Sequence, residues 1–236
     1  MNENVAAVTL GELRAGYGHR EVLRGVTAKL PSRRLTAVVG ANGAGKSSLL
    51  NVIAGVLPAT SGSVRVGGAV RPAYVTQHSE VSDALPITVR ATVAMGRWAH
   101  RGPWRRLTKK DRAVVEECLE RLDITSIAHR RLGTLSGGQR QRALVAQGLA
   151  QQSGLLLLDE PAAGLDLRAR TLIDEALSAA RDDGVTVVRV THDLAVADQA
   201  DHCLLLRDGG LVAEGPPRSV LTPARVAEAW GVPVPR

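Results

Sequence analysis

Residues 40–47 read Gly-Ala-Asn-Gly-Ala-Gly-Lys-Ser and match the phosphate-binding loop pattern G-x-x-x-x-G-K-[ST] in full. Glycines at these positions let the backbone curl so that consecutive N–H groups point inward at phosphate oxygens. Lys46 supplies a positive charge for the β- and γ-phosphates, and the Ser47 hydroxyl is placed to ligate Mg²⁺. The stretch therefore predicts a nucleotide-binding site. Its candidate binding residues are Gly40, Asn42, Gly43, Ala44, Gly45, Lys46, Ser47 and Ser48.

The segments around this loop have the composition that it requires. Residues 35–39 predict an apolar strand that runs into Gly40, and residues 47–54 predict a helix whose positive N-terminal end faces the phosphates. Farther along, a buried aliphatic strand ends in Asp159 and Glu160. An acid in that place often caps a helix, but with the phosphate loop upstream Asp159 is a candidate metal ligand. Glu160 could then take a proton from an attacking water.

Residues 135–139, Leu-Ser-Gly-Gly-Gln, form a third motif in front of a predicted helix. Ser136, Gly137, Gly138 and Gln139 would present N–H and hydroxyl donors at the positive end of that helix. Alone, the pentapeptide is an ordinary Ser-Gly-Gly helix start. Together with the phosphate loop and the two acids, it resembles the family signature of the ATP-binding subunits of ABC (ATP-binding cassette) transporters.

The resemblance covers nearly the whole chain, and further matches follow in the family's order. Tyr17 matches the aromatic residue that stacks on adenine, and Gln77 matches the glutamine that senses Mg²⁺ and contacts the membrane partner. Asp166 matches the loop that crosses the dimer interface, and His192 matches the histidine near the γ-phosphate. A lone His is more often a surface or core residue, and a Tyr can also be purely structural, so these roles are implied by position in the family's pattern.

The resemblance also implies a mechanism. Two copies of the chain would sandwich two ATP molecules with Mg²⁺, each ATP held by the phosphate loop of one copy and residues 136–139 of the other. Lys46, Glu160 and His192 would be catalytic, with Glu160 polarising the water. The implied partners are a second copy, integral-membrane permease subunits and, indirectly, an extracytoplasmic substrate-binding protein. The chain would then sit at the cytoplasmic face of the membrane.

The patterning along the chain predicts an α/β fold, and the resemblance makes it a P-loop NTPase with a RecA-like core. Continuous apolar strands that alternate with helices favour a mostly parallel sheet. We expect one ATP-binding domain over residues 1–236, with an N-terminal antiparallel β subdomain and an inserted α-helical subdomain. The core lobe would comprise 1–78 and 152–236, and the helical lobe 79–151. Expected strands cover 5–10, 13–15, 22–30, 35–39, 63–66, 73–76, 155–158, 185–190, 203–207 and 211–213. Expected helices cover 47–54, 88–96, 109–122, 138–151, 168–181 and 194–200.

The composition is that of a globular protein. Of the 236 residues, 44% are hydrophobic and 22% are charged, which excludes wholesale disorder. The longest aliphatic run is far shorter than the roughly 20 residues of a membrane span, and no signal peptide is visible. The two cysteines show neither metal-ligand nor disulfide spacing. We therefore expect a soluble intracellular protein.

The charge balance is basic. Thirty Lys and Arg against 23 Asp and Glu give a net charge of +7, and the densest basic stretch lies between Arg97 and Arg112. This stretch is compatible with a solvated helical face, a membrane-surface role or nucleic acid. Single-stranded nucleic acid usually requires aromatic stacking platforms, and the chain has three Trp, two Tyr and no Phe. We expect no nucleic-acid partner.

The helical lobe indicates the kind of transporter. Residues 85–89 (Leu-Pro-Ile-Thr-Val), 93–98 (Val-Ala-Met-Gly-Arg-Trp) and 105–112 resemble the zinc and manganese uptake branch. Importers of iron–siderophore complexes, haem and cobalamin share parts of this pattern, and a soluble ABC ATPase would use the same ATP site. A nucleotide kinase or GTPase would leave residues 135–139 unexplained. We expect the ATPase of a bacterial importer of a divalent metal, with zinc first.

Overall fold

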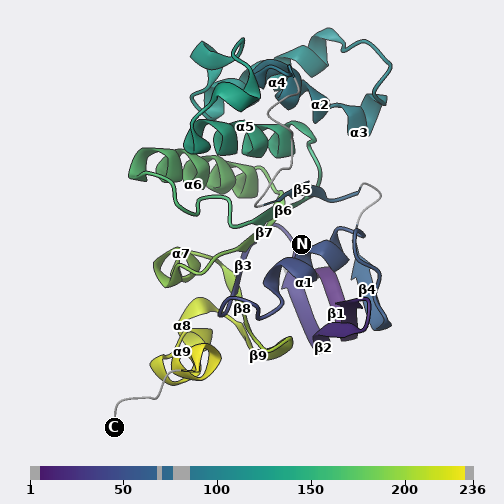
Figure 1. Ribbon diagram of the computed structural model, residues 1–236, viewed down its shortest axis with the longest axis vertical. Helices are drawn as coiled ribbons and strands as arrows, with labels where there is room; N and C mark the ends of the chain where they lie inside the picture. The colour runs from purple at the N-terminus through teal and green to yellow at the C-terminus, as the bar shows by residue number, and fades with distance from the viewer. Residues whose placement is uncertain (1–5, 68–70, 77–85, 232–236) are drawn as a thin grey trace.

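The computed structural model describes residues 6–67, 71–76 and 86–231, and its centre is a six-stranded sheet in the order β5-β6-β7-β3-β8-β9 (Figure 1). The first five strands in this order are parallel, and β9 pairs antiparallel with β8. The central strands are apolar and buried on both faces, as expected of a parallel sheet covered by helices. The strands are β3 (Leu35–Val39), β5 (Ala73–Val75), β6 (Leu155–Asp159), β7 (Thr186–Val190), β8 (His202–Arg207) and β9 (Gly210–Gly215).

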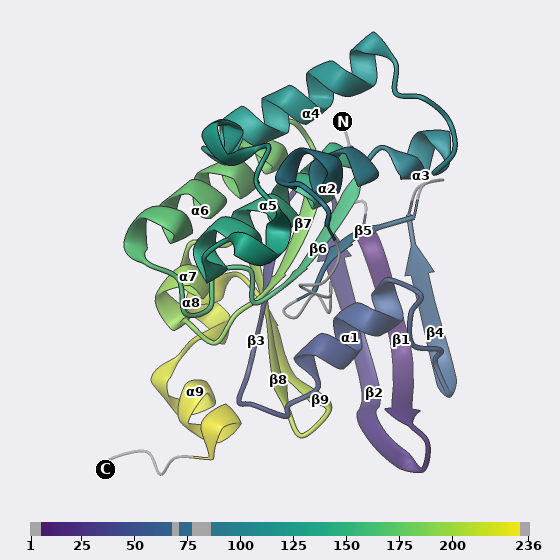
Figure 2. The same ribbon diagram turned by 45° about the horizontal axis from the view of Figure 1, so that its top comes forward.

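A second, antiparallel sheet comes from the first part of the chain. It has the order β2-β1-β4, with β1 at Ala6–Tyr17, β2 at Arg20–Pro31 and β4 at Ser61–Val66. Helix α1 (Lys46–Ile53) packs against strands of both sheets, and the three elements share one apolar core (Figure 2). The phosphate loop is thereby fixed between the two sheets at the start of α1.

A layer of helices covers the other side of the central sheet (Figure 1). Its core joins apolar side chains from four of these helices to the inner faces of β5, β6 and β7. The helices of this layer are α2 (Val89–Met95), α3 (Trp98–Arg101), α4 (Lys109–Arg121), α5 (Gly137–Ala150) and α6 (Leu167–Asp182), and two short 3₁₀ turns occur at Thr125–Ile127 and Leu132–Thr134. In the ranges that the structure describes, no helix is long and apolar enough to span a bilayer.

The predicted α/β class is confirmed, with its mostly parallel sheet, N-terminal antiparallel sheet and helices inserted between β5 and β6. Two expected strands, 5–10 and 13–15, are one strand in the structure. An irregular register between Leu10 and Leu13, with Glu12 at a φ of 47°, lets β1 continue through what looked like a break. Three helices were not predicted: α3, α8 (Pro217–Val220) and α9 (Pro223–Trp230). Two of these have only four residues, too few to show a periodic pattern.

Candidate nucleotide-binding site

The loop between β3 and α1 depends on its glycines. Gly43 and Gly45 have φ values of 81° and 98°, in the left-handed region that favours glycine. At Gly40, an added Cβ would lie 2.3 Å from the backbone oxygen of Leu206. A larger residue at Gly40 would push the loop away from β8, so the loop in this form requires glycine there.

Lys46 lies under the loop. Its ammonium donates hydrogen bonds to the carbonyl oxygens of Gly40 at 2.8 Å and Ala41 at 2.9 Å. Burial lowers the pKa of Lys46, while the carboxylates of Glu160 and Asp159 act in the opposite direction. The lysine thus places its charge at the loop and within the electrostatic reach of both acids at the end of β6.

Glu160 and His192 follow neighbouring parallel strands. Asp159, the last residue of β6, is paired in register with Val190, the last residue of β7. Glu160 follows at a φ of 46°, and its N–H donates to the Val190 carbonyl at 3.2 Å. Nδ1 of His192 lies 3.3 Å from Oε2 of Glu160. The structure therefore brings the expected base and the expected histidine together at one edge of the sheet.

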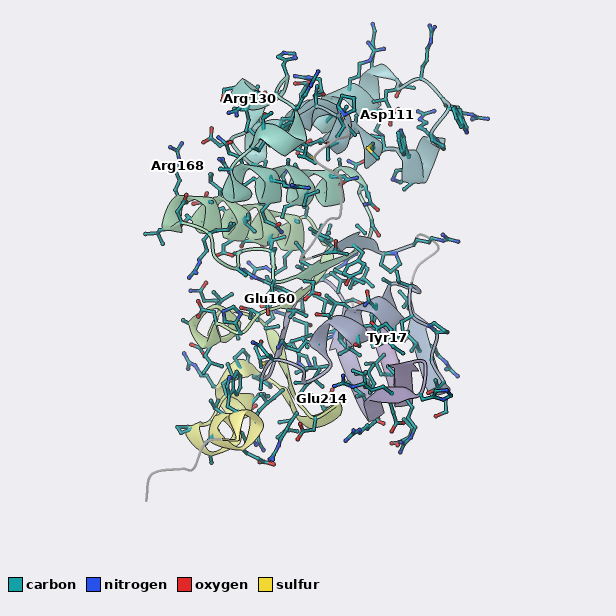
Figure 3. All side chains as sticks on the ribbon, viewed as in Figure 1. Tyr17, Asp111, Arg130, Glu160, Arg168 and Glu214 are labelled. Carbon is teal, nitrogen blue, oxygen red and sulfur yellow. The ribbon has the colours of Figure 1, made fainter. Side chains whose placement is uncertain are left out.

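An open cleft of about 910 Å³ adjoins the loop and these side chains. Tyr17, at the end of β1, is half exposed there, and its hydroxyl accepts a hydrogen bond from Asn51 at 3.0 Å. Glu160 and Tyr17 are labelled in Figure 3, on the central and antiparallel sheets respectively. The cleft is lined by Tyr17, Arg20, Val22, Gly40, Ala41, Asn42, Gly43, Gly45, Lys46, Ser47, Ser48, Glu160, His192 and Trp230.

The lining includes four residues that were not among the predicted binding or catalytic residues: Arg20, Val22, Ala41 and Trp230. Arg20 begins β2 immediately after the turn that follows Tyr17. Trp230 ends the unpredicted helix α9, whose local signals are the Thr222 cap, Pro223 in the first turn and Gly231 at the C-terminal end. Conversely, Ala44 does not line the cleft: it is buried in the core shared by the two sheets.

The candidate metal ligands Ser47 and Asp159 offer a hydroxyl and a carboxylate. Ser47 is exposed on the cleft, whereas Asp159 is buried at the end of β6 and acts electrostatically on Lys46 beside it. Mg²⁺ prefers a small number of hard oxygen donors from the protein, which leaves room for phosphate and water in its coordination shell. These residues fit such an ion. Gln77, the third candidate, lies outside the described residues.

The Leu-Ser-Gly-Gly-Gln motif begins α5 as predicted, with a capping box. Ser136 Oγ accepts from the Gln139 N–H at 3.3 Å, and Gln139 Oε1 accepts from the Ser136 N–H at 3.2 Å. Asp166 caps α6 by accepting from the Ala169 N–H at 2.7 Å. Ser136, Gly138, Gln139 and Asp166 line a separate cleft of about 430 Å³, and the neighbouring Gly137 is exposed. Among the residues in 6–67, 71–76 and 86–231, the two clefts have none in common.

Sequence comparisons relate this chain to proteins of one family. The family described as "ABC transporter" matches residues 23–163. The chain is 38% identical over 228 residues to the manganese transport system ATP-binding protein MntB of Listeria monocytogenes, covering 93% of this chain and 94% of that protein. It is 40% identical over 238 residues to the hemin import ATP-binding protein HmuV of Streptomyces coelicolor, covering 95% and 83%.

Solved structures show the same arrangement. A metal-chelate type ABC transporter in an inward-facing conformation superposes with a TM-score of 0.86 at 28% identity, over 97% of this chain and 90% of that one. A dimeric ATP-binding cassette, MJ0796, in a post-hydrolysis state with ADP and phosphate superposes with a TM-score of 0.77 at 25% identity, over 89% and 99%.

The fold and the site define a P-loop nucleoside triphosphatase. The chain belongs to the ABC transporter family and is an ATPase.

Proposed function

We propose that two copies of this chain sandwich two ATP molecules and drive an importer of metal ions or metal chelates. The observation that carries the proposal is the separation of the two clefts. The phosphate loop lines one cleft, the Ser136–Gln139 motif lines the other, and none of the residues that the structure describes lines both. One chain therefore offers two different halves of a site, and a second copy turned to face it would complete both.

The phosphate loop supplies most of the stabilisation of the phosphoryl group. Backbone N–H groups of the loop and the N-terminus of α1 would donate to the phosphate oxygens. Lys46 would leave the carbonyls of Gly40 and Ala41, which hold its ammonium here, and turn to the β- and γ-phosphates. Ser136 and Gly138 of the second copy would add donors on the far side of the γ-phosphate. Fixed donors around a transferring phosphoryl group account for much of catalysis in such enzymes.

Glu160 is the proposed general base. Its carboxylate lies largely shielded from solvent at the floor of the cleft, while the neighbouring His192 side chain is 59% exposed toward it. Glu160 would accept the proton of the attacking water, and His192 would hold the water and the γ-phosphate in line. The 3.3 Å separation of the two side chains lets one water contact both.

Mg²⁺ would be held by Ser47 and Asp159, with Gln77 as a third ligand. When bound, the ion neutralises charge on the phosphates during transfer. Tyr17 would stack on the adenine at the outer end of the cleft, where its ring is half exposed. Asp166 would lie at the dimer interface beside the second copy's nucleotide.

The proposed cargo is a metal ion or a metal chelate. The relatives described above are named for manganese and for hemin transport, and the sequence of the helical lobe favours zinc. This chain would not contact the cargo. It would bind permease subunits at the cytoplasmic face of the membrane, and these would receive the cargo from an extracytoplasmic binding protein.

Metal accumulation tests the proposal. Deletion of the gene from its host should lower the cellular content of one metal when that metal is scarce, with zinc, manganese and haem iron measured in parallel. The wild-type gene should restore uptake, whereas the Glu160→Gln form should not. Normal content of all three metals in the deletion strain would refute the cargo class, and ATPase assays of the purified chain would still test the site.

A further inference from the structure

The segment between α3 and α4 presents an exposed basic and aromatic surface, which we call the 102–110 tip. Trp104 in this tip is 95% exposed, and Trp98 at the start of α3 is 41% exposed. Figures 1 and 2 show the α3–α4 connection projecting from the edge of the helical layer, away from α1 and the phosphate loop. An indole this exposed contributes nothing to the core. Its position favours a role in contact with another molecular surface.

The cations of the tip are uncompensated. Arg105, Arg106, Lys109 and Lys110 are all exposed. Within the described ranges, no carboxylate forms an ion pair with any of them. The acid nearest in sequence, Asp111, is 2% exposed and turned inward. The tip therefore combines a concentrated positive charge with an exposed indole.

The base of the tip is held rigidly by Asp111, which is labelled in Figure 3 at the start of α4. Its carboxylate accepts from Nε of Arg97 at 3.1 Å and from Nε of Arg101 at 3.0 Å. It also accepts from the Thr108 N–H at 3.0 Å. Arg101 and Thr108 are the residues on either side of the 102–107 connection. One buried carboxylate therefore ties together the two ends of the 102–107 connection.

We propose that the 102–110 tip binds the surface of a membrane that contains anionic lipids. Tryptophan favours the boundary between headgroups and acyl chains, and clustered Lys and Arg are attracted to anionic headgroups. A projecting tip with outward cations fits a planar surface, whereas single-stranded nucleic acid would require several stacking rings. The inference rests on the proposed function only in placing the chain beside a bilayer, and the tip is remote from the nucleotide cleft.

Vesicle binding by the purified full-length chain tests the tip. The probes are vesicles of phosphatidylcholine alone and vesicles with about one-third phosphatidylglycerol. The wild-type chain should co-sediment with the anionic vesicles at low salt and less so at high salt. Each cation near an anionic surface contributes about fivefold to partitioning. The Arg105→Gln/Arg106→Gln variant should therefore partition about 25-fold more weakly, and Trp104→Ala several-fold more weakly.

A matched control has the same charge loss elsewhere. Arg24 and Arg65 are exposed on the antiparallel sheet, and Arg24→Gln/Arg65→Gln should bind vesicles like the wild type. All these variants should retain ATPase activity, so a failure of the membrane proposal is distinct from a failure of the ATP site.

Three results would overturn the proposal: equal binding to neutral vesicles, equal loss in the control variant, or no vesicle binding at all. In the last case, lost affinity for detergent-solubilised permease in the Arg105→Gln/Arg106→Gln variant would assign the tip to a protein partner. Salt-sensitive binding of duplex DNA that disappears in the same variant would assign it to nucleic acid.

Discussion

Nδ1 of His192 lies 3.3 Å from Oε2 of Glu160, where the adjacent strands β7 and β6 end. The two groups proposed to handle the attacking water are thus assembled within one chain. The Ser136–Gln139 motif, in contrast, lines a cleft that contains neither of them. The side chains that would activate the attacking water therefore come from one copy. The Ser136–Gln139 motif that would complete the same ATP site must come from a second copy.

Replacing Glu160 by Gln tests the general base. The substitution keeps the size of the side chain but removes its ability to accept a proton, while Lys46 and Ser47 remain to bind the phosphates. Losing a general base costs on the order of 10²–10⁴ in rate. ATP should still bind, and the chain should shift from monomer to dimer with MgATP on size-exclusion chromatography. Wild-type turnover in this variant would show that Glu160 is not the base.

A second substitution tests whether the ATP-dependent dimer expected of Glu160→Gln uses Ser136. Adding Ser136→Arg to this variant places a bulky cationic side chain at the start of α5, against the second copy's γ-phosphate. The double variant should bind ATP through its intact phosphate loop and remain monomeric. Persistence of the ATP-dependent dimer would contradict a role for Ser136 in the sandwich.

Lys46→Ala tests the phosphate loop. The substitution removes the ammonium that lies within 2.9 Å of two loop carbonyls, and no other lysine of the described part of the chain lines the cleft. ATPase activity should be abolished and nucleotide affinity weakened. Circular dichroism and thermal unfolding serve as the folding controls, because the side chain is buried. Near-normal hydrolysis by a folded Lys46→Ala chain would remove the loop from the mechanism.

Two variants, Tyr17→Ala and Tyr17→Phe, distinguish a stacking role of the Tyr17 ring from a hydrogen-bonding role of its hydroxyl. Tyr17→Ala should weaken ATP binding by about 1–3 kcal/mol if the ring stacks on the base. Tyr17→Phe loses only the hydrogen bond from Asn51 and should bind ATP nearly as the wild type does. Isothermal titration measures both, and equal affinities for wild type and Tyr17→Ala would make Tyr17 purely structural.

Much of this site was predictable because its signals are local. The strand at Leu35–Val39 has the predicted bounds, since an apolar run there lies between Arg34 and Gly40. The start of α5 is within one residue of the prediction, because Ser136 and Gln139 cap it without help from elsewhere. Both elements are determined by residues that are neighbours along the chain.

The features that were not predicted depend on contacts between residues that are far apart in the sequence. Arg97 looked like part of a solvated basic stretch, yet it is 5% exposed. Its guanidinium donates to the Ala150 carbonyl at 2.7 Å and to the side chain of Gln152 at 3.0 Å. Trp230 reaches the nucleotide cleft only because α9 packs against β8. Neither result follows from local sequence.

Asp111 gives a pH-dependent prediction. Hydrogen bonds from the side chain and backbone of Thr108 hold the pKa of Asp111 well below its usual value, and Arg97 and Arg101 act in the same direction. Because the folded pKa lies below the unfolded value of about 3.9, the unfolded chain binds the proton more readily. The stabilisation is therefore present above about pH 4 and is lost as the pH falls through that value toward the folded pKa.

Asp111→Asn should remove this dependence. At pH 7 the variant should unfold at a lower urea concentration than the wild type, because Arg97 stays buried without its charged partner. Between about pH 5 and pH 2, its stability should fall less steeply than that of the wild type. Asp208→Asn is the control: its carboxylate is 78% exposed beside Arg207, so the wild-type slope should persist. Parallel pH profiles for the wild type and Asp111→Asn would mean that the carboxylate of Asp111 carries no share of the acid sensitivity, and that hydrogen bonds alone hold the base of the 102–110 tip.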